Sequence, residues 1–283
     1  WTAGAHLDIV VAPEFLRQYS MCGDPADRSC YEIAVLQEPE GRGGSQLMHR
    51  IFEPGRRVFV SKPINHFELE PSAKLSLLFG GGIGVTPMLA FAHELHRKGG
   101  RFRLMYSASQ KSKAAFDGAF DGLAWADRVS RHYSDQGTRL DIARDVPAYD
   151  AGTHIYVCGP DAYMSAILDH ARSIGYPEAA LHAEFFTVPE LPEWENHPFE
   201  IERANGQKIP VTATQSASDA LIAAGIPVDV KCADGLCGVC KCTVLSGEVE
   251  HRDFVLSAAQ RETTVILCQS RAAEAGGMLK LDI

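Results

Sequence analysis

The sequence predicts a multidomain protein of β, α/β and α+β parts, and three observations carry this prediction. Apolar and polar residues alternate in short runs from about residue 6 to residue 69, which is the period of half-buried strands. From about residue 74, apolar strands alternate with helical stretches, as in a doubly wound parallel sheet. The last part has four cysteines from Cys232 to Cys242, which follow a predicted hairpin and a predicted helix in the sequence.

Composition narrows the class of protein. The 283 residues are 46% hydrophobic and 22% charged, with no apolar run near the roughly 20 residues that cross a bilayer. The net charge of −9 argues against nucleic acid or a membrane surface as partner. Clustered cysteines favour a metal site in a reducing compartment, hence a cytoplasmic protein. The chain opens at Trp1 without a leader, so we expect a piece of a longer protein.

The first part reads as an antiparallel sheet or barrel. Its strands are predicted in HLDIVVA, CYEIAVLQE and RRVFVSKP, at residues 6–12, 30–38 and 56–63. In GRGGSQLMHRIF, glycines and a serine precede a helix, an arrangement that offers backbone N–H groups to a phosphate. Gly43, Gly44 and Ser45 are the candidates, and an ordinary turn with a serine cap is the alternative.

The α/β part places a glycine-rich turn between a strand and a helix. LSLLFGGG leads into MLAFAHELHRK, and RFRLMYSAS, HIYVCGP and AYMSAILDHARSIG continue the alternation. A dinucleotide pyrophosphate binds in this setting, although the turn is not the G-x-G-x-x-G fingerprint. Close packing of strand and helix is the alternative explanation for the glycines.

The strand at 101–109 bears on the choice of nucleotide, because the adenosine ribose should bind at its end. No Asp or Glu occurs there. Ser107, Ser109, Lys111 and Lys113 could instead hold a 2′-phosphate, which favours NADPH over NADH. A solvated loop is the alternative.

The last part contains a metal-binding pattern. VPELPEWENHP predicts a linker over 188–197, and a hairpin around Asn205-Gly206 and a helix follow. Cys232, Cys237 and Cys240 have the C-x4-C-x2-C spacing of plant-type iron-sulfur proteins, and Cys268 supplies a fourth thiolate. Zinc is the alternative, but structural zinc usually takes ligands in two close pairs. Cys242 lies outside the pattern and is expected to be a small buried residue on a strand.

CADGLCGVCKCTVLSGEVEHRDFVLS, with CQSRA and the ending LKLDI, is similar to the ferredoxin domain of the phthalate dioxygenase reductase family. The resemblance continues upstream and implies three domains in order. These are an FMN-binding β-barrel at 1–72, incomplete at its N-terminus, an NAD(P)H-binding domain at 73–187, and a β-grasp ferredoxin domain carrying [2Fe-2S] at 198–283.

The resemblance also implies roles for individual residues. RQYS resembles the family's flavin motif, in which Tyr19 lines the isoalloxazine, Ser20 lies near its N5 and Arg17 binds the phosphate. The segment 41–52 caps the terminal phosphate of FMN. GGGIGVTP and VCGPDAY resemble the nicotinamide motifs, in which Cys158 lies at the site of hydride transfer. The remaining candidates are Gly81, Gly82, Gly84, Thr86, Gly159, Pro160 and, beside the flavin, Phe185.

The predicted function follows from the electron count of the implied cofactors. A nicotinamide donates two electrons together, whereas a [2Fe-2S] cluster accepts one, so a flavin must mediate. We therefore expect electrons to pass from NAD(P)H through FMN and the cluster to an oxygenase. The acceptor is either a Rieske-type enzyme in a separate subunit or a haem-thiolate monooxygenase fused to the chain. The alternative is a metal-binding or passive ferredoxin-type carrier without nucleotide-dependent catalysis.

Overall fold

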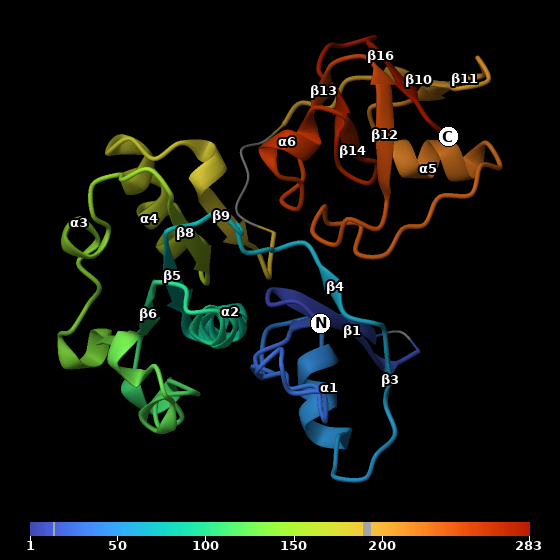
Figure 1. Cartoon of the computed structure of the whole chain (residues 1–283). Helices are drawn as coiled ribbons and strands as arrows, with labels where there is room; N and C mark the ends of the chain where they lie inside the picture. Colours follow the sequence, from blue (N-terminus) through green and yellow to red (C-terminus); the bar gives the residue numbers. More distant parts are fainter. Residues whose placement is uncertain (14, 189–193) are drawn as a thin grey trace. The chain divides into compact units, whose positions relative to one another are not determined.

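The computed structural model describes residues 1–13, 15–188 and 194–283 and divides into two compact units, Trp1–Glu184 and Phe185–Ile283 (Figure 1). The centre of the expected linker, 189–193, lies outside the described residues. The expected division at 72/73 falls inside the first unit and stays a prediction. No helix in the described ranges is long and apolar enough to cross a membrane.

The first unit begins with a small antiparallel sheet centred on one strand. The central strand pairs with three others, and the four are β1 (Ala5–Ala12), β2 (Phe15–Ser20), β3 (Phe59–Val60) and β4 (Ile64–Asn65). Leu7, Ile9 and Val11 alternate along β1 and are buried with Met48 of helix α1 (Gly44–Ile51). This alternation is the period-2 pattern that the sequence shows.

The strand expected at 30–38 does not form. Only an isolated antiparallel bridge joins Ile33 to Met21, and the backbone N–H of Cys22 donates to the Glu32 carbonyl. This bridge lies directly after the end of β2, and the pairing does not continue from it along the outer edge of β2, so no strand forms at 30–38. The expected strand at 56–63 shortens to the two residues of β3, which pair only with Ile9 and Val10.

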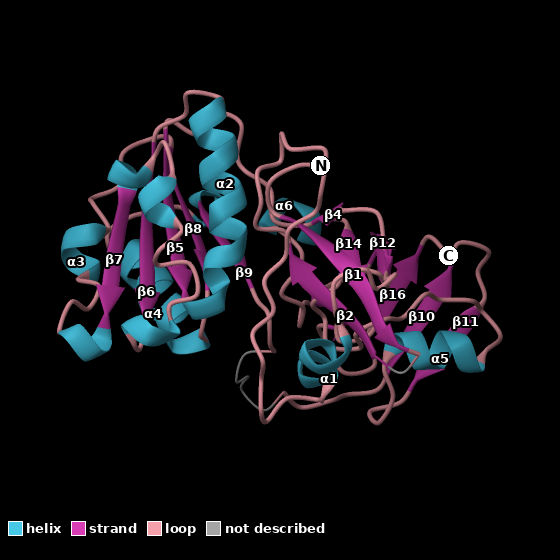
Figure 2. Ribbon diagram, turned by 90° about the horizontal axis from the view of Figure 1, so that it is seen from below, coloured by secondary structure: helices cyan, strands magenta, loops and turns pink. Residues whose placement is uncertain are grey.

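The second part of this unit is a five-stranded parallel sheet in the order β7-β6-β5-β8-β9. Figure 2 shows the helices beside it. Right-handed crossovers in opposite directions from β5 and β8 place α2 and α4 on opposite faces. The strands are β5 (Leu75–Gly81), β6 (Phe102–Ala108), β7 (Val129–Tyr133), β8 (Thr153–Cys158) and β9 (Leu181–Glu184), and the α-helices are α2 (Val85–Arg97), α3 (Ile142–Asp145) and α4 (Asp161–Ser173).

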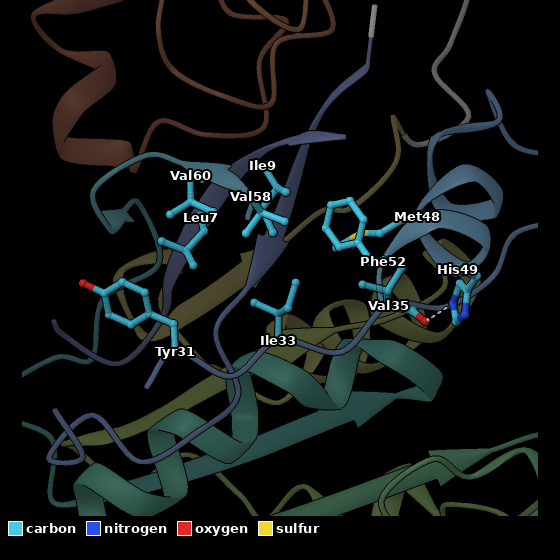
Figure 3. Close-up of a pocket in the computed structure, with 10 residues that line it drawn as sticks. All are labelled: Leu7, Ile9, Tyr31, Ile33, Val35, Met48, His49, Phe52, Val58 and Val60. Atoms are coloured by element: carbon cyan, nitrogen blue, oxygen red, sulfur yellow. Dashed lines mark hydrogen bonds between the residues drawn. The ribbon is translucent and has the colours of Figure 1, made fainter. Parts of the chain in front are cut away.

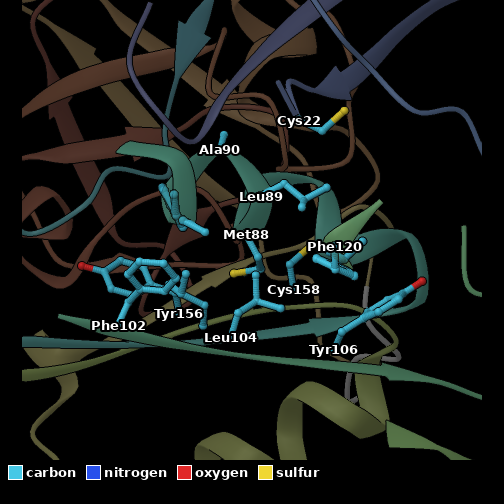
Figure 4. Packing of buried hydrophobic residues seen from close by; sticks show 14 of the residues in the cluster. Cys22, Met88, Leu89, Ala90, Phe102, Leu104, Tyr106, Phe120, Tyr156 and Cys158 are labelled. Atoms are coloured by element: carbon cyan, nitrogen blue, oxygen red, sulfur yellow. The ribbon is translucent and has the colours of Figure 1, made fainter. Parts of the chain in front are cut away.

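Because helices cover both faces of the sheet, both sides of each strand are buried. The strand sequences are therefore continuously apolar rather than alternating. Six of the seven residues of β5 are buried. The largest core cluster lies between α2 and the sheet and includes Met88, Leu104, Tyr156 and Cys158 (Figure 4). Single-turn helices fill the connections, namely η1 (Gly82–Gly84), η2 (Lys111–Lys113), η3 (Phe120–Gly122), η4 (Ala126–Arg128), η5 (Ser134–Gln136) and η6 (Glu178–Ala180).

The second unit is a β-grasp domain, a mixed sheet crossed by a helix. Its strand order is β11-β10-β16-β12-β14, in which β10 and β16 are parallel and the other pairs antiparallel. The predicted hairpin at Asn205-Gly206 joins its first two strands. The elements are β10 (Phe199–Arg203), β11 (Lys208–Val211), α5 (Ala217–Ala223), β12 (Lys241–Ser246), β13 (Val249–Glu250), α6 (Ala258–Arg261), β14 (Thr264–Ile266), β15 (Arg271–Ala272) and β16 (Met278–Leu281).

Candidate functional site

The carboxyl ends of the parallel strands meet at one edge of the sheet in the first unit. In the strand register, Gly80 of β5 lies beside Cys158 of β8, and Cys158 lies beside Glu184 of β9. On the other side of β5, Gly81 lies beside Ser107 of β6. The edge thus brings the glycine-rich turn, the Cys-Gly-Pro turn and the end of β9 together, which is where open α/β sheets bind ligands.

Two glycines let these turns touch through their backbones. A Cβ on Gly84 would lie 2.4 Å from the carbonyl carbon and oxygen of Cys158, and one on Gly159 would lie 2.9 Å from the Gly81 Cα. Gly82 has φ of +56° and open space on its Cβ side. The hydroxyl of buried Thr86 donates to the Ile83 carbonyl at 2.9 Å, so it braces the turn. The turn therefore packs against the Cys-Gly-Pro turn through backbone atoms and leaves one side open.

A polar pair joins the antiparallel sheet to the parallel sheet. Ser20, the last residue of β2, donates its hydroxyl to Glu184 Oε2 at 3.0 Å. Burial raises the pKa of Glu184 to about 7, and the hydrogen bond from Ser20 opposes that shift. Burial, with the nearby Glu184 charge, raises the pKa of Cys158, so its thiol stays protonated at neutral pH. The site thus contains one group that titrates near neutrality.

Glu184 is the residue that sequence reasoning missed. It belongs to AEFFT, where the aromatic neighbour Phe185 was singled out instead. The available signal was an acidic residue at the end of an apolar strand of the parallel sheet. Phe185 itself belongs to the second unit, where its ring centre lies 5.2 Å from that of Phe254.

A phosphate-sized cradle lies at the start of α1. The helix begins after Gly43, whose φ of +81° is a left-handed conformation suited to glycine. Arg17 lies so near the helix start that a Cβ on Gly44 would be 2.5 Å from its Nε. Ser45 Oγ accepts from the Glu38 N–H at 3.1 Å, which leaves the hydroxyl hydrogen to donate. A cation beside free helix N–H groups is an anion site, and it fits the terminal phosphate of FMN.

The cradle opens onto a polar pocket of about 740 Å³ whose lining includes Gly43, Gln46 and Arg50. A separate groove of about 490 Å³ follows the inner face of β1 (Figure 3). Leu7 and Ile9 form one wall of this groove, and its other lining residues are Tyr31, Ile33, Val35, Met48, His49, Phe52, Val58 and Val60. Among the described residues, this lining has no Arg or Lys, so it does not suit a phosphate. Tyr19 is half-buried and packs against the hydrophobic cluster that contains Leu7, Ile9 and Met48, residues that also line the groove.

The expected ribose-binding residues lie at and beyond the end of β6. Ser107 is in β6 with its hydroxyl oxygen buried, while Ser109 and Lys111 are exposed in the following loop. The Lys111 amine lies 3.8 Å from Asp117 Oδ2. This lysine is therefore already engaged by a carboxylate.

The second unit brings the four predicted metal ligands together. Hydrogen bonds link the sulfurs of Cys232 and Cys237, of Cys232 and Cys268, and of Cys240 and Cys268. The thiols thus form a chain of contacts, and in the described residues no three potential ligands surround a single ion position. These contacts lower the pKa of Cys232 and of Cys240 and raise the pKa of Cys237 and of Cys268, because each hydrogen bond favours a thiolate on one partner and a thiol on the other.

The backbone around these sulfurs is curled so that amides point at them. The Asp234 N–H donates to Cys232 Sγ at 3.3 Å, and further N–H groups donate from Leu236 to Cys232 and from Gly235 to Cys268. Ala233, with φ of +57°, is the one described non-glycine residue with positive φ. Amide donors around a thiolate set suit an iron-sulfur cluster, because they stabilise its negative charge.

Comparisons with known proteins agree with this geometry. Residues 200–273 match the 2Fe-2S iron-sulfur cluster binding domain. The chain is 40% identical over 285 residues to vanillate O-demethylase oxidoreductase of Pseudomonas sp. (strain HR199 / DSM 7063), covering 99% of this chain and 90% of the relative. The solved structure of phthalate dioxygenase reductase matches with 34% identity and a TM-score of 0.68, covering 100% of this chain and 88% of that one. The chain belongs to the phthalate dioxygenase reductase family.

Membership of the phthalate dioxygenase reductase family confirms the predicted fold class of flavin-binding barrel, nucleotide-binding parallel sheet and β-grasp ferredoxin domain. An intact type IV self-sufficient cytochrome P450 monooxygenase matches with 36% identity and a TM-score of 0.91 over the whole chain. This chain spans 37% of the length of that protein. The family therefore includes both separate reductases and a segment of a larger enzyme.

Proposed function

We propose that this chain takes a hydride from NAD(P)H at FMN and delivers single electrons through a [2Fe-2S] cluster to an oxygenase. The observation that carries the proposal is the hydrogen bond from Ser20 to Glu184, one strand away from Cys158. This bond joins the end of β2 to the end of β9 and so supports the proposal that flavin and nicotinamide meet there. The thiol set of the second unit supplies the one-electron end of the path.

FMN, when bound, supplies the change from two-electron to one-electron transfer. Arg17 and the N-terminal amides of α1 hold its phosphate, and Ser20 presents a hydroxyl to the reacting face. Glu184 sets the direction of that hydroxyl, because as a carboxylate it accepts the Ser20 hydrogen and as an acid it can donate instead. Cys158, buried and protonated, fills the floor of the nicotinamide site and excludes water.

The acceptor is an oxygenase, in keeping with the names of the relatives. The relative from Pseudomonas is an O-demethylase oxidoreductase, and the larger structural match is a self-sufficient cytochrome P450. We propose a Rieske-type oxygenase in a separate subunit or a haem-thiolate domain in the same chain as the acceptor class. Reduction of a purified Rieske oxygenase or of a haem-thiolate domain by the reduced chain, followed by absorbance, distinguishes the two.

The experiment that tests the proposed function combines a spectrum with a matched pair of cysteine variants. The purified protein should show flavin and iron-sulfur bands that bleach with NADH or NADPH without oxygen. Cys268→Ser should lose the iron-sulfur bands and the bound iron but keep the flavin bands.

The control is Cys242→Ser, because Cys242 lies in β12 and makes contacts with the Thr243 and Asp282 carbonyls rather than with the four thiols. It should retain its iron. A colourless wild-type protein that holds zinc, or an iron content unaffected by Cys268→Ser, would contradict the proposal. An iron-sulfur protein without flavin would support the passive carrier instead.

A further inference from the structure

The end of β6 has no acidic residue of its own, but the neighbouring strand supplies one. Asp135 lies in η5, directly after β7, and its backbone N–H donates to the Ser109 carbonyl at 3.1 Å. Its side chain returns to the same loop, where Oδ1 and Oδ2 accept from the Lys111 N–H at 3.2 and 3.3 Å. These bonds fix a carboxylate over the loop that follows β6.

Of the two lysines in this loop, Lys113 is exposed and Lys111 is turned toward other partners. The Lys111 amine lies 3.8 Å from Asp117 Oδ2 and 5.8 Å from the centre of the Tyr133 ring. The hydroxyl of Tyr133 also donates to Asp117. A dianionic phosphate at the loop would therefore meet the Asp135 carboxylate and a lysine whose charge Asp117 already offsets.

The position matches where an adenosine ribose would lie. Ala108 of β6 is in register with Tyr133 of β7, so Asp135 stands at the same carboxyl edge as Cys158 of β8. From β8 across β5 and β6 to β7 are three strand spacings, or roughly 14 Å. A dinucleotide lying along this edge with its nicotinamide end at Cys158 has its adenosine end at β6 and β7.

We infer that Asp135 is a specificity-determining residue that selects NADH over NADPH, an inference that rests on the proposed function. Its carboxylate accepts hydrogen bonds from the 2′- and 3′-hydroxyls of the adenosine ribose and repels a 2′-phosphate. Each oxygen keeps lone pairs for this purpose, because both share the single Lys111 N–H. This preference is opposite to the one that the serines and lysines of the loop indicate by sequence alone.

The test compares Asp135→Asn with the wild type, both carrying flavin and cluster. Asn keeps an oxygen that can accept from the Lys111 N–H, so the loop stays in place while the charge is removed. The wild type should show higher kcat/KM for NADH than for NADPH by about tenfold or more, and the variant should lose about that factor, because a charge within a few ångströms of the phosphate is removed. Calorimetric titration with ADP and with adenosine 2′,5′-bisphosphate should show the same change in preference.

Asp127→Asn is the matched control, since Asp127 is an exposed carboxylate in η4, at the opposite end of β7. It should leave both preferences as in the wild type. A wild type that prefers NADPH, an unchanged preference in Asp135→Asn, or an equal change in Asp127→Asn would overturn the inference. Failure of both nucleotides to reduce the flavin contradicts the proposed function instead, and the two adenosine nucleotides still decide the preference by binding.

Discussion

At the scale of single residues, the chemistry that we propose for the nicotinamide site depends on which atom of the Ser20–Glu184 pair carries the proton. Above the Glu184 pKa of about 7, the carboxylate accepts the Ser20 hydrogen. Below it, the acid can donate to Ser20 and free the serine hydrogen for an acceptor in the site. Protonation of one buried group thus changes Ser20 from an acceptor to a donor toward the site.

We expect this proton to appear in the pH dependence of flavin reduction. The rate with NADH should fall by about two- to tenfold as pH rises through 7, the range that one hydrogen bond of roughly 0.5–1.5 kcal/mol gives. In Glu184→Gln the amide donates to Ser20 at every pH, so the rate should stay near its low-pH value. Anaerobic stopped-flow absorbance between about pH 6 and pH 8 measures both profiles.

Ser20→Ala is the control for that experiment. Without the hydroxyl, the rate should be low and independent of pH around neutrality, whatever the state of Glu184. A Glu184→Gln profile that still falls through pH 7 would show that another group titrates, and the role given to Glu184 would be wrong.

Gly84 provides a second residue-scale prediction. Gly84→Ala would place a methyl group 2.4 Å from the Cys158 carbonyl, and both partners are backbone atoms that cannot rotate away. We expect a loss of about 1–3 kcal/mol in the free energy of unfolding, as for other overpacked sites, together with weaker nucleotide binding. Gly118→Ala is the control, because its Cβ would have no atom within 4 Å. Equal melting temperatures for the two variants would contradict the backbone contact.

At the scale of elements, the proposed flavin phosphate site is formed by one helix and one strand together. Helix α1 offers unpaired N–H groups at its start, and β2 places Arg17 beside them. Neither element alone would indicate a phosphate site, because helix ends without a nearby cation are common and so are exposed arginines. Their proximity follows from the pairing of β2 with β1, against which α1 packs.

We therefore expect Arg17→Ala to weaken FMN binding without unfolding the protein. Loss of a charged hydrogen-bond donor to the phosphate should cost about 1.5–3 kcal/mol, or roughly ten- to a hundredfold in affinity. Titration of the flavin-free protein with FMN, followed by quenching of flavin fluorescence, measures the change. Arg57→Ala removes an exposed arginine of the same unit and should have no effect. Similar affinities for the two variants would place the phosphate elsewhere.

Element predictions from sequence succeeded where the pattern was local and failed where pairing was required. The helices α2 and α4 and the hairpin at Asn205-Gly206 follow from periodicity and turn chemistry. The expected strand at 30–38 has the right alternation but forms only the isolated bridge between Ile33 and Met21. Alternation reports which side of a segment is buried, and it does not report whether a partner is available.

At the scale of the whole molecule, the chain has separate cores for separate cofactors. The clusters that include Phe91 and Leu7 lie in the first unit, and the one that includes Leu279 lies in the second. Within the second unit, Arg271 donates twice to the His197 carbonyl and Arg252 donates to Asn196 Oδ1. Because the cores are separate, we expect the two units to unfold independently.

Scanning calorimetry should show this independence as two unfolding transitions. FMN at about a hundredfold above its Kd adds about 2.7 kcal/mol to the unit that binds it, which should raise the melting temperature of that transition by roughly 5–10 °C. Loss of the iron should lower the other transition alone. A single transition that both cofactors shift equally would contradict two independent units.

Short sequence motifs are enough to identify two parts of this protein, the cluster ligands and the glycine-rich turn. The thiolate set of Cys232, Cys237 and Cys240 and the glycine turn after β5 are readable because their residues are close in the chain and of restricted type. The roles that we propose for Glu184 and Asp135 could be found only from the tertiary structure. Glu184 contacts Ser20, and Asp135 contacts Lys111, although the residues of each pair are far apart in the sequence. These contacts depend on strand order and register, which no local sequence pattern specifies.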